Sequence, residues 1–286
     1  MSDSTVLRNE FIMGAKFQRD WIEGRGLWLL AAIYLGGVGG GVYIASILVD
    51  WHLGLLVGIG ITAILKGGAH LLFLTHPWKF WRIFAKPQTS WISRGIYFVS
   101  LFVVFGMAYY VMGGTTLKVI SVFFALCLVI YTGFVLMASR PISFWNNPLL
   151  PILFVCVSLG SGISLTETIH TFSPQHIAHP ELLTVAGLWA VSVTALLLFV
   201  YLAGTFYAST TAKESLMYLL KGELAPLFYI GVVFLGILLP LAISFATSSG
   251  LMPSSALAVA GISELAGAFI LRYSILKAGI SGPVAS

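Results

Sequence analysis

Residues 28 to 49 read WLLAAIYLGGVGGGVYIASILV, a run of 22 residues without a charged side chain. A helix rises about 1.5 Å per residue, so about twenty apolar residues cross the hydrocarbon core of a bilayer. Its glycines, Gly36-Gly37-Val38-Gly39-Gly40-Gly41, superficially resemble a nucleotide-binding loop, but no strand precedes them and they lie inside the apolar run. Small residues four positions apart let membrane helices pack backbone to backbone. The stretch therefore predicts a closely packed membrane-spanning helix.

The rest of the chain repeats this pattern. Of its 286 residues 58% are hydrophobic and only 9% are charged, whereas about 25% of residues are charged in a soluble domain. No alternation typical of a membrane barrel competes with helices, so the predicted fold is all-α, polytopic, with eight transmembrane helices. We expect the spans at Trp28 to Val49, Leu53 to Thr75, Gly95 to Gly113, Leu117 to Ala138, Pro148 to Thr168, Leu182 to Tyr207, Leu224 to Ala246 and Leu251 to Tyr273.

Positive charge is distributed unequally between the two sides of the predicted bundle. Residues 1–27 form a polar segment with interleaved aromatic and basic residues, which predicts an interfacial amphipathic segment rather than a cleavable signal. Of the 15 lysines and arginines, all but Lys66 and Lys118 fall on the side of this segment, called the N-terminal side below. The positive-inside rule then predicts that both termini are cytoplasmic and that the protein lies in the inner (cytoplasmic) membrane. This asymmetry accounts for the net charge of +5 without a nucleic-acid partner.

The sequence does not favour a metal centre. Cys127 and Cys156 are two cysteines near the middle of predicted spans, whereas an iron–sulfur cluster normally needs four ligands. Only His70 lies well inside a span, so bis-histidine haem ligation is not expected either. The histidines and acids at 167–181 match no standard metal-ligand spacing, and a solvated loop is the better interpretation.

Lys66 lies near the centre of the second predicted span, with His70 one turn later on the same face. An ionisable residue at this depth indicates a functional site by default, although burial for packing alone is the alternative. Tyr131 in the fourth span and Tyr34 in the first lie at a similar level. We predict that these four side chains line one pocket for a ligand with a polar ring.

The second half of the chain has its own buried charges. Glu167 lies near one end of the fifth span, and Glu264 lies deep in the eighth with Arg272 two turns later. Either a proton relay or a structural ion pair would explain Glu264 and Arg272, and the sequence alone does not separate them.

Several blocks of sequence, in this order, resemble the NrfD / polysulfide reductase membrane-subunit family, which also includes the anchor subunit of dimethyl sulfoxide reductase. The resemblance covers nearly the whole chain. The blocks are Tyr34-Leu35-Gly36-Gly37-Val38-Gly39-Gly40-Gly41, His76-Pro77-Trp78-Lys79-Phe80-Trp81, Thr89-Ser90-Trp91-Ile92-Ser93-Arg94-Gly95, Tyr131-Thr132-Gly133, Arg140-Pro141, Trp145-Asn146, Leu220-Lys221-Gly222-Glu223-Leu224-Ala225-Pro226-Leu227, Ser263-Glu264-Leu265-Ala266-Gly267 and Leu271-Arg272-Tyr273.

The resemblance implies two four-helix bundles, at 28–138 and 148–273, followed by a tail at 274–286. It implies a quinone (menaquinone or ubiquinone) bound in the first bundle, with no haem, and the family's pocket tyrosine matches Tyr131. Two positions depart from the family pattern. Phe73 stands where relatives often have an acidic residue or a histidine, and Ala32 stands near the place of a first-span histidine, so Lys66 and His70 are the expected substitutes.

The resemblance also implies partners: an iron–sulfur subunit of four-cluster ferredoxin character and usually a molybdenum- or tungsten-pterin catalytic subunit. Arg94, Arg140, Trp145 and Asn146 all fall on the N-terminal side, which predicts partner docking at the cytoplasmic face. The alternative is that the basic side attracts an acidic partner and the charge rule misleads.

The function expected from these features is that of a quinone-binding membrane anchor, passing electrons between the iron–sulfur partner and membrane quinone, with Glu264, Glu167 and Arg272 as candidates for proton transfer. Two alternatives remain open. Eight spans in two similar halves would also suit a secondary transporter, and a purely structural anchor needs no redox site.

Overall fold

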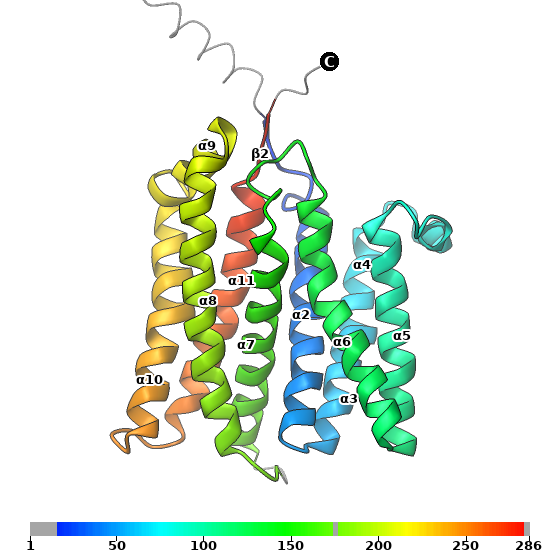
Figure 1. The fold of residues 1–286 in the computed structure, drawn as a ribbon, viewed down its shortest axis with the longest axis vertical. Coiled ribbons are helices and arrows are strands. Elements are labelled where there is room, and N and C mark those ends of the chain that lie inside the picture. The colour runs from blue at the N-terminus through cyan, green and yellow to red at the C-terminus, as the bar shows by residue number, and fades with distance from the viewer. Residues whose placement is uncertain (1–15, 174–176, 283–286) are drawn as a thin grey trace, which may run out of the picture.

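A computed structural model describes residues 16–173 and 177–282. It confirms the all-α prediction, because eight helices in this part of the protein are long and apolar enough to cross a membrane. Figure 1 shows them side by side. The spans are α2 (Gly26–Leu48), α3–η1–α4 (His52–Gly60, Ile61–Lys66, Gly67–Phe73), α5 (Trp91–Met112), α6 (Thr115–Met137), α7 (Leu149–Phe172), α8 (Glu181–Ala208), η3–α10 (Leu227–Leu238, Leu239–Ser248) and α11 (Ala256–Lys277).

The boundaries follow from local chemistry. Helix α5 begins at Trp91, four residues before the predicted Gly95, because the Ser90 side chain accepts a hydrogen bond from the Ser93 amide and caps the helix. It ends at Gly113, and both Gly113 and Gly114 have positive φ angles (68° and 90°). Glycine adopts these angles without steric cost, so the backbone reverses into α6 within two residues.

Two groups of four spans meet at a central seam. The spans α2 to α6 contact one another, as do α7, α8, η3–α10 and α11, and α2 packs against α7 along the seam (Figure 1). There the backbones touch: a Cβ atom added to Gly41 would overlap the Ser158 carbonyl, and one added to Gly162 would overlap the Gly41 backbone. The glycine-rich sequence therefore forms the centre of the protein, as small residues do at membrane helix contacts.

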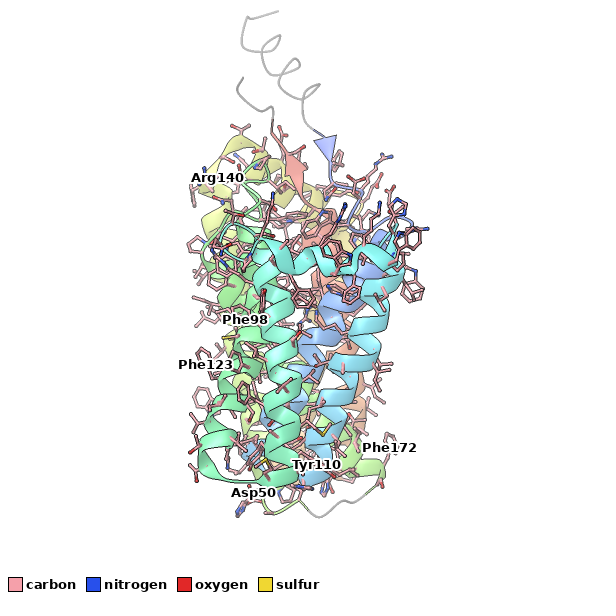
Figure 2. The ribbon with its side chains drawn as sticks, turned by 90° about the vertical axis from the view of Figure 1, so that its right-hand side faces the viewer. Asp50, Phe98, Tyr110, Phe123, Arg140 and Phe172 are labelled. Atoms are coloured by element: carbon pink, nitrogen blue, oxygen red, sulfur yellow. The ribbon has the colours of Figure 1, made fainter. Side chains whose placement is uncertain are left out.

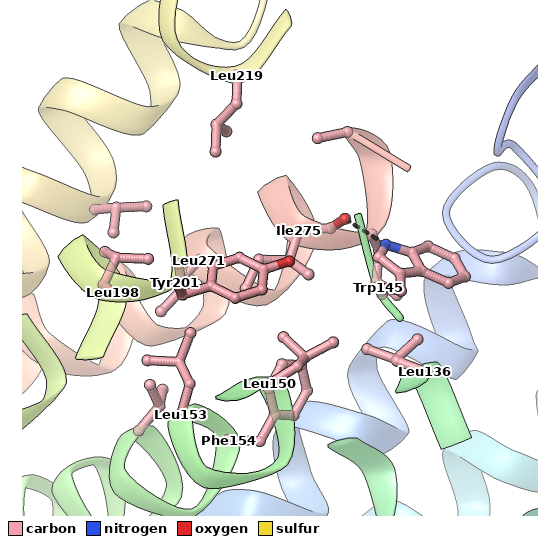
Figure 3. Close-up of a cluster of buried hydrophobic side chains, with 14 of the residues drawn as sticks. Leu136, Trp145, Leu150, Leu153, Phe154, Leu198, Tyr201, Leu219, Leu271 and Ile275 are labelled. Atoms are coloured by element: carbon pink, nitrogen blue, oxygen red, sulfur yellow. Dashed lines mark hydrogen bonds between the residues drawn. The ribbon is translucent and has the colours of Figure 1, made fainter. Parts of the chain in front are cut away.

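A buried cluster on the N-terminal side joins the connection between α6 and α7 to the second group of spans (Figure 3). The Trp145 side chain is 1% exposed, and its indole N–H donates to the Ile275 carbonyl of α11 at 2.8 Å. The Tyr201 hydroxyl of α8 donates to the Phe144 carbonyl at 2.6 Å. Both aromatic side chains thus satisfy their polar atoms while they fill the core.

Short elements outside the spans lie on the N-terminal side. Strand β1 (Lys16–Phe17) pairs antiparallel with β2 (Ile280–Ser281), which brings the two ends of the described residues together. A 3-10 helix, η2 (Pro77–Ala85), connects α4 to α5, and α9 (Thr210–Lys221) connects the sixth span to the seventh. The amphipathic segment predicted at 1–27 lies largely outside the described residues, and its described part contains β1 instead. Figure 2 shows Arg140 at this end and Asp50 and Phe172 at the other.

The second span is not a uniform α-helix. Its central segment η1, from Ile61 to Lys66, is π-helical, with Thr62 and Lys66 buried. A π-helical turn holds an extra residue and is frequent at functional sites. The irregular turn ends at the lysine that the sequence singles out.

Candidate functional site

The first group of spans encloses a cavity of about 650 Å³ towards the N-terminal side, called the large cavity below. Its walls come from α2, the second span, η2, α5 and α6 and are mostly apolar, and the polar side chains that reach it include Lys66, His70, Tyr131 and Thr132. Pockets for small organic ligands have this size range and this balance of apolar wall and few polar groups. The lining residues are Trp21, Leu29, Ile33, Ala63, Ile64, Lys66, Gly67, Gly68, His70, Leu71, Phe73, Leu74, Phe80, Ile83, Ile92, Ile96, Val99, Tyr131, Thr132 and Val135.

Lys66 and Tyr131 form a hydrogen-bonded pair in its wall. Lys66 is 2% exposed, and its Nζ donates to the Tyr131 hydroxyl at 2.8 Å and to the Ala32 carbonyl at 3.3 Å. Within residues 16–173 and 177–282, no carboxylate forms an ion pair with Lys66. A buried amine with only neutral partners favours a ligand with electron-rich oxygen atoms.

Two glycines make room for this pair. A Cβ atom on Gly36 would lie 3.0 Å from both Cδ and Nζ of Lys66, and one on Gly95 would overlap the Tyr131 ring. The lysine therefore crosses α2 where that helix has no side chain, and the tyrosine lies flat against α5. The glycine-rich run thus shapes the site as well as the seam.

His70 lies one turn after Lys66 on the cavity wall. Its Nδ1 is buried beside the Lys66 backbone and has no hydrogen bond of normal geometry within the described part of the protein. A buried polar atom without a partner is costly, and a ligand that bonds to it would remove that cost. His70 is thus available for a ligand, whereas Lys66 and Tyr131 already hold each other in place.

Tyr34 does not line the large cavity. Its hydroxyl donates to the Leu265 carbonyl of α11 at 3.1 Å, and its ring lies against Phe269. The Arg272 guanidinium lies 5.6 Å from the centre of the Tyr34 ring. Tyr34 therefore faces the second group of spans, on the opposite side of α2 from Lys66.

Arg272 is buried, at 1% exposure, and does not pair with Glu264. Its guanidinium donates to the Ala268 carbonyl and to the Ser158 hydroxyl, while Glu264 accepts from the Ser164 hydroxyl at 2.5 Å. Of the two explanations for these charges, a direct ion pair is absent from the described residues. Arg272 instead joins α11 to α7 through hydrogen bonds.

Glu167 and Glu264 are brought together by a small cavity of about 10 Å³ between α7, α8, α10 and α11. Glu167 is 7% exposed and accepts from the Thr184 hydroxyl at 2.6 Å. A cavity of this size holds about one water molecule when polar groups line it. Both carboxyl groups therefore lie at a single polar void in the second group of spans.

The four predicted docking residues differ in accessibility. Arg140 and Asn146 are exposed on the N-terminal side. The Arg94 guanidinium donates to the Pro87 and Gln88 carbonyls, which stabilises the loop before α5, and Trp145 lies in the core. Only the first two present accessible side chains at the surface.

The sequence reasoning missed several contributors to the site. Thr132, next to Tyr131, reaches the large cavity, and Phe80 and Ile83 of η2 close one side of it. Gly36 and Gly95 act only through the space they leave. The block Tyr131-Thr132-Gly133 contained a signal for Thr132, but nothing local to η2 predicts that it folds back over the cavity.

The fold and the site define a polytopic α-helical membrane protein with a large apolar cavity and a few polar groups in its wall. The family model described as "Polysulphide reductase, NrfD" matches residues 25–283, and the protein belongs to this family. It is 27% identical to the C subunit of polysulfide reductase from Wolinella succinogenes, over 88% of its own length and 93% of the relative. It is 28% identical to protein NrfD of Escherichia coli, over 79% of its own length and 81% of that relative. Membership agrees with a role as a membrane anchor of an oxidoreductase.

Proposed function

We propose that this protein is the quinone-reactive membrane subunit of an oxidoreductase complex and that the large cavity binds the quinone head group. The observation that carries the proposal is the Lys66–Tyr131 pair, with the unpaired His70 Nδ1 beside it, in the wall of a cavity of about 650 Å³. When bound, the quinone would accept or donate two electrons and two protons. The rest of the chemistry belongs to the residues around it.

The residues present fit such a ligand. A quinone head group is a planar, largely apolar ring with two carbonyl oxygens, so it needs flat apolar walls and a few hydrogen-bond donors. Gly67 and Gly68 leave part of the wall without side chains, and Phe73 and Val99 supply apolar surface. The two positions that depart from the family pattern lie at the site: Phe73 lines the cavity, and the Ala32 carbonyl accepts from Lys66.

Each polar group has a distinct part in this proposal. Lys66 Nζ has donor capacity beyond its two protein partners and stabilises negative charge that develops on a quinone oxygen. Tyr131 fixes the position of the amine. His70 offers a ring nitrogen that hydrogen-bonds the ligand and can exchange a proton with it.

The test is turnover of the assembled complex. Tyr131→Phe and His70→Leu should abolish quinone-linked turnover and leave the complex active with artificial dyes that bypass the quinone. His52→Leu is the matched control, because His52 stacks on Tyr110 at the opposite end of the bundle, outside the cavity. Normal quinone turnover in both cavity variants would refute the site.

The partner proposed for the N-terminal side is an iron–sulfur subunit of four-cluster ferredoxin character, which would receive electrons from a molybdenum- or tungsten-pterin subunit. The relative from Wolinella succinogenes is named as one of several polysulfide reductase subunits, which supports membership in a multi-subunit complex. The exposed Arg140 and Asn146 support docking on this face, and its excess of lysine and arginine supports a cytoplasmic location. Purification of the native complex should yield cluster-bearing subunits and an extractable quinone; a protein purified alone, without quinone, would instead favour a transporter.

A second candidate role is proton transfer through the second group of spans. It is favoured by the shared void at Glu167 and Glu264, whose carboxyl groups accept from Thr184 and Ser164. Proteoliposomes that contain the complex should show a change of internal pH during quinone turnover, and Glu264→Gln should abolish that change. Turnover without any change of internal pH in the unaltered complex would remove this role.

A further inference from the structure

The segment η2 has an outer face that the proposed quinone site does not use. None of its residues is buried, and Trp78 and Trp81 are 69% and 60% exposed. Its other side faces the protein: Phe80 and Ile83 line the large cavity, and the Tyr97 hydroxyl of α5 donates to the Phe84 carbonyl. The segment is therefore amphipathic, with a fixed inner side and a free outer side.

The charge of this outer face has one sign. Lys79, Arg82 and Lys86 are exposed, and no aspartate or glutamate occurs between Leu74 and Arg94. The Arg82 guanidinium lies 5.8 Å from the centre of the Trp81 ring. Tryptophan combined with lysine and arginine is typical of surfaces at the level of lipid head groups.

The position of η2 favours lipid over a protein docked on top of the bundle. Figure 1 shows the segment between α4 and α5 projecting sideways from the ends of the spans, beyond the outline of the bundle. The surface next to it faces the acyl chains, since Leu72 of α4 is 54% exposed. The outer face of η2 thus continues the lipid-facing surface at the height where phosphate groups lie.

We propose that η2 is a binding surface for anionic phospholipid, in which Trp78 and Trp81 enter the interface and Lys79, Arg82 and Lys86 contact lipid phosphates. Each basic residue close to an anionic membrane surface favours binding by about fivefold. Because the inner side of the same segment lines the large cavity, anionic lipid would also hold that wall in place. This last consequence rests on the proposed quinone site, whereas lipid binding itself does not.

The test uses the full-length protein in nanodiscs that contain equal amounts of phosphatidylglycerol and phosphatidylcholine. The photoreactive amino acid benzoylphenylalanine replaces Trp78, and mass spectrometry measures the ratio of the two lipid adducts after illumination. We expect phosphatidylglycerol adducts to exceed phosphatidylcholine adducts by about fivefold or more. The same label in place of Phe172, exposed at the opposite end of the bundle, should give a ratio near one (Figure 2).

Charge variants separate the role of η2 from general attraction to the basic side. The triple variant K79Q/R82Q/K86Q should bring the ratio at position 78 close to one. The matched control K213Q/K221Q/K277Q removes three basic residues from the same side of the bundle and should leave the ratio high. A ratio of one in the unaltered sequence, or an unchanged ratio in the first variant, would overturn the proposal.

The same label applied in native membranes, with the complex assembled, tests the other occupant. Phospholipid adducts at position 78 are expected. An adduct with a second protein in place of lipid would show that η2 is covered by a partner and would also overturn the proposal. Neither result depends on whether the large cavity binds a quinone.

Discussion

Gly36→Ala should weaken quinone binding without disturbing the fold. The added Cβ would lie 3.0 Å from Cδ and Nζ of Lys66 and 3.1 Å from Cε, whereas carbon atoms in contact are normally about 3.5–4.0 Å apart. Lys66 must then move by about 0.5–1 Å, away from a position in which Nζ is 2.8 Å from the Tyr131 hydroxyl. A hydrogen bond to a charged group contributes about 1.5–3 kcal/mol, so complete loss would cost a factor of about 10 to 150.

The lysine side chain is flexible and recovers part of this loss, so we expect the Kd for a short-chain quinone to rise by about tenfold. Isothermal titration calorimetry on the purified full-length protein in detergent measures this without partner subunits. The control is Gly60→Ala, since no atom lies within 4 Å of a Cβ at Gly60 and alanine favours a helix by about 0.5–1 kcal/mol. Equal affinity in both variants, or equal loss in both, would refute the reasoning.

Three further substitutions test the packing through thermal unfolding in detergent. Gly162→Ala should destabilise the protein by about 3 kcal/mol, because the new methyl group meets backbone that cannot rotate away; an unchanged melting temperature would contradict the close seam. Trp145→Phe should cost about 1–3 kcal/mol by leaving a buried carbonyl of α11 without its donor, while Trp189→Phe, at a side chain that is 69% exposed, should cost almost nothing. Ser158→Ala should cost about 1.5–3 kcal/mol because the Arg272 guanidinium loses a buried acceptor, and stability equal to that of the unaltered protein would show that this bond contributes nothing.

The spans could be predicted from the sequence because hydropathy over about twenty residues decides whether a helix is stable in lipid. The prediction was less accurate at the ends. The first turn of α5 contains Ser93 and Arg94, which made it look like loop, although polar residues are stable in a helix at the level of the head groups. Helix α9 was missed since Lys213, Glu214 and Lys221 make it too polar to be a span.

Part of the candidate site could be predicted from depth in the membrane. Lys66, His70 and Tyr131 do line one cavity, because an ionisable group in a span is stable only beside polar partners. Tyr34 lies at the same depth but on another face of α2. Successive residues turn by 100°, so Ile33 and Gly36 face the cavity while Tyr34 and Gly37 face α11. Depth can be read from a sequence, whereas the face that a helix presents to each neighbour depends on packing.

The close contact between the first and fifth spans has a consequence for how the protein is made. Gly41 cannot meet Gly162 until about 120 further residues have been translated, which takes on the order of ten seconds. During that time α2 is in the bilayer without its main neighbour, and its bare backbone is open to any helix with a small-residue face. The first four spans are therefore a half-assembled product in which the correct partner of α2 is still on the ribosome.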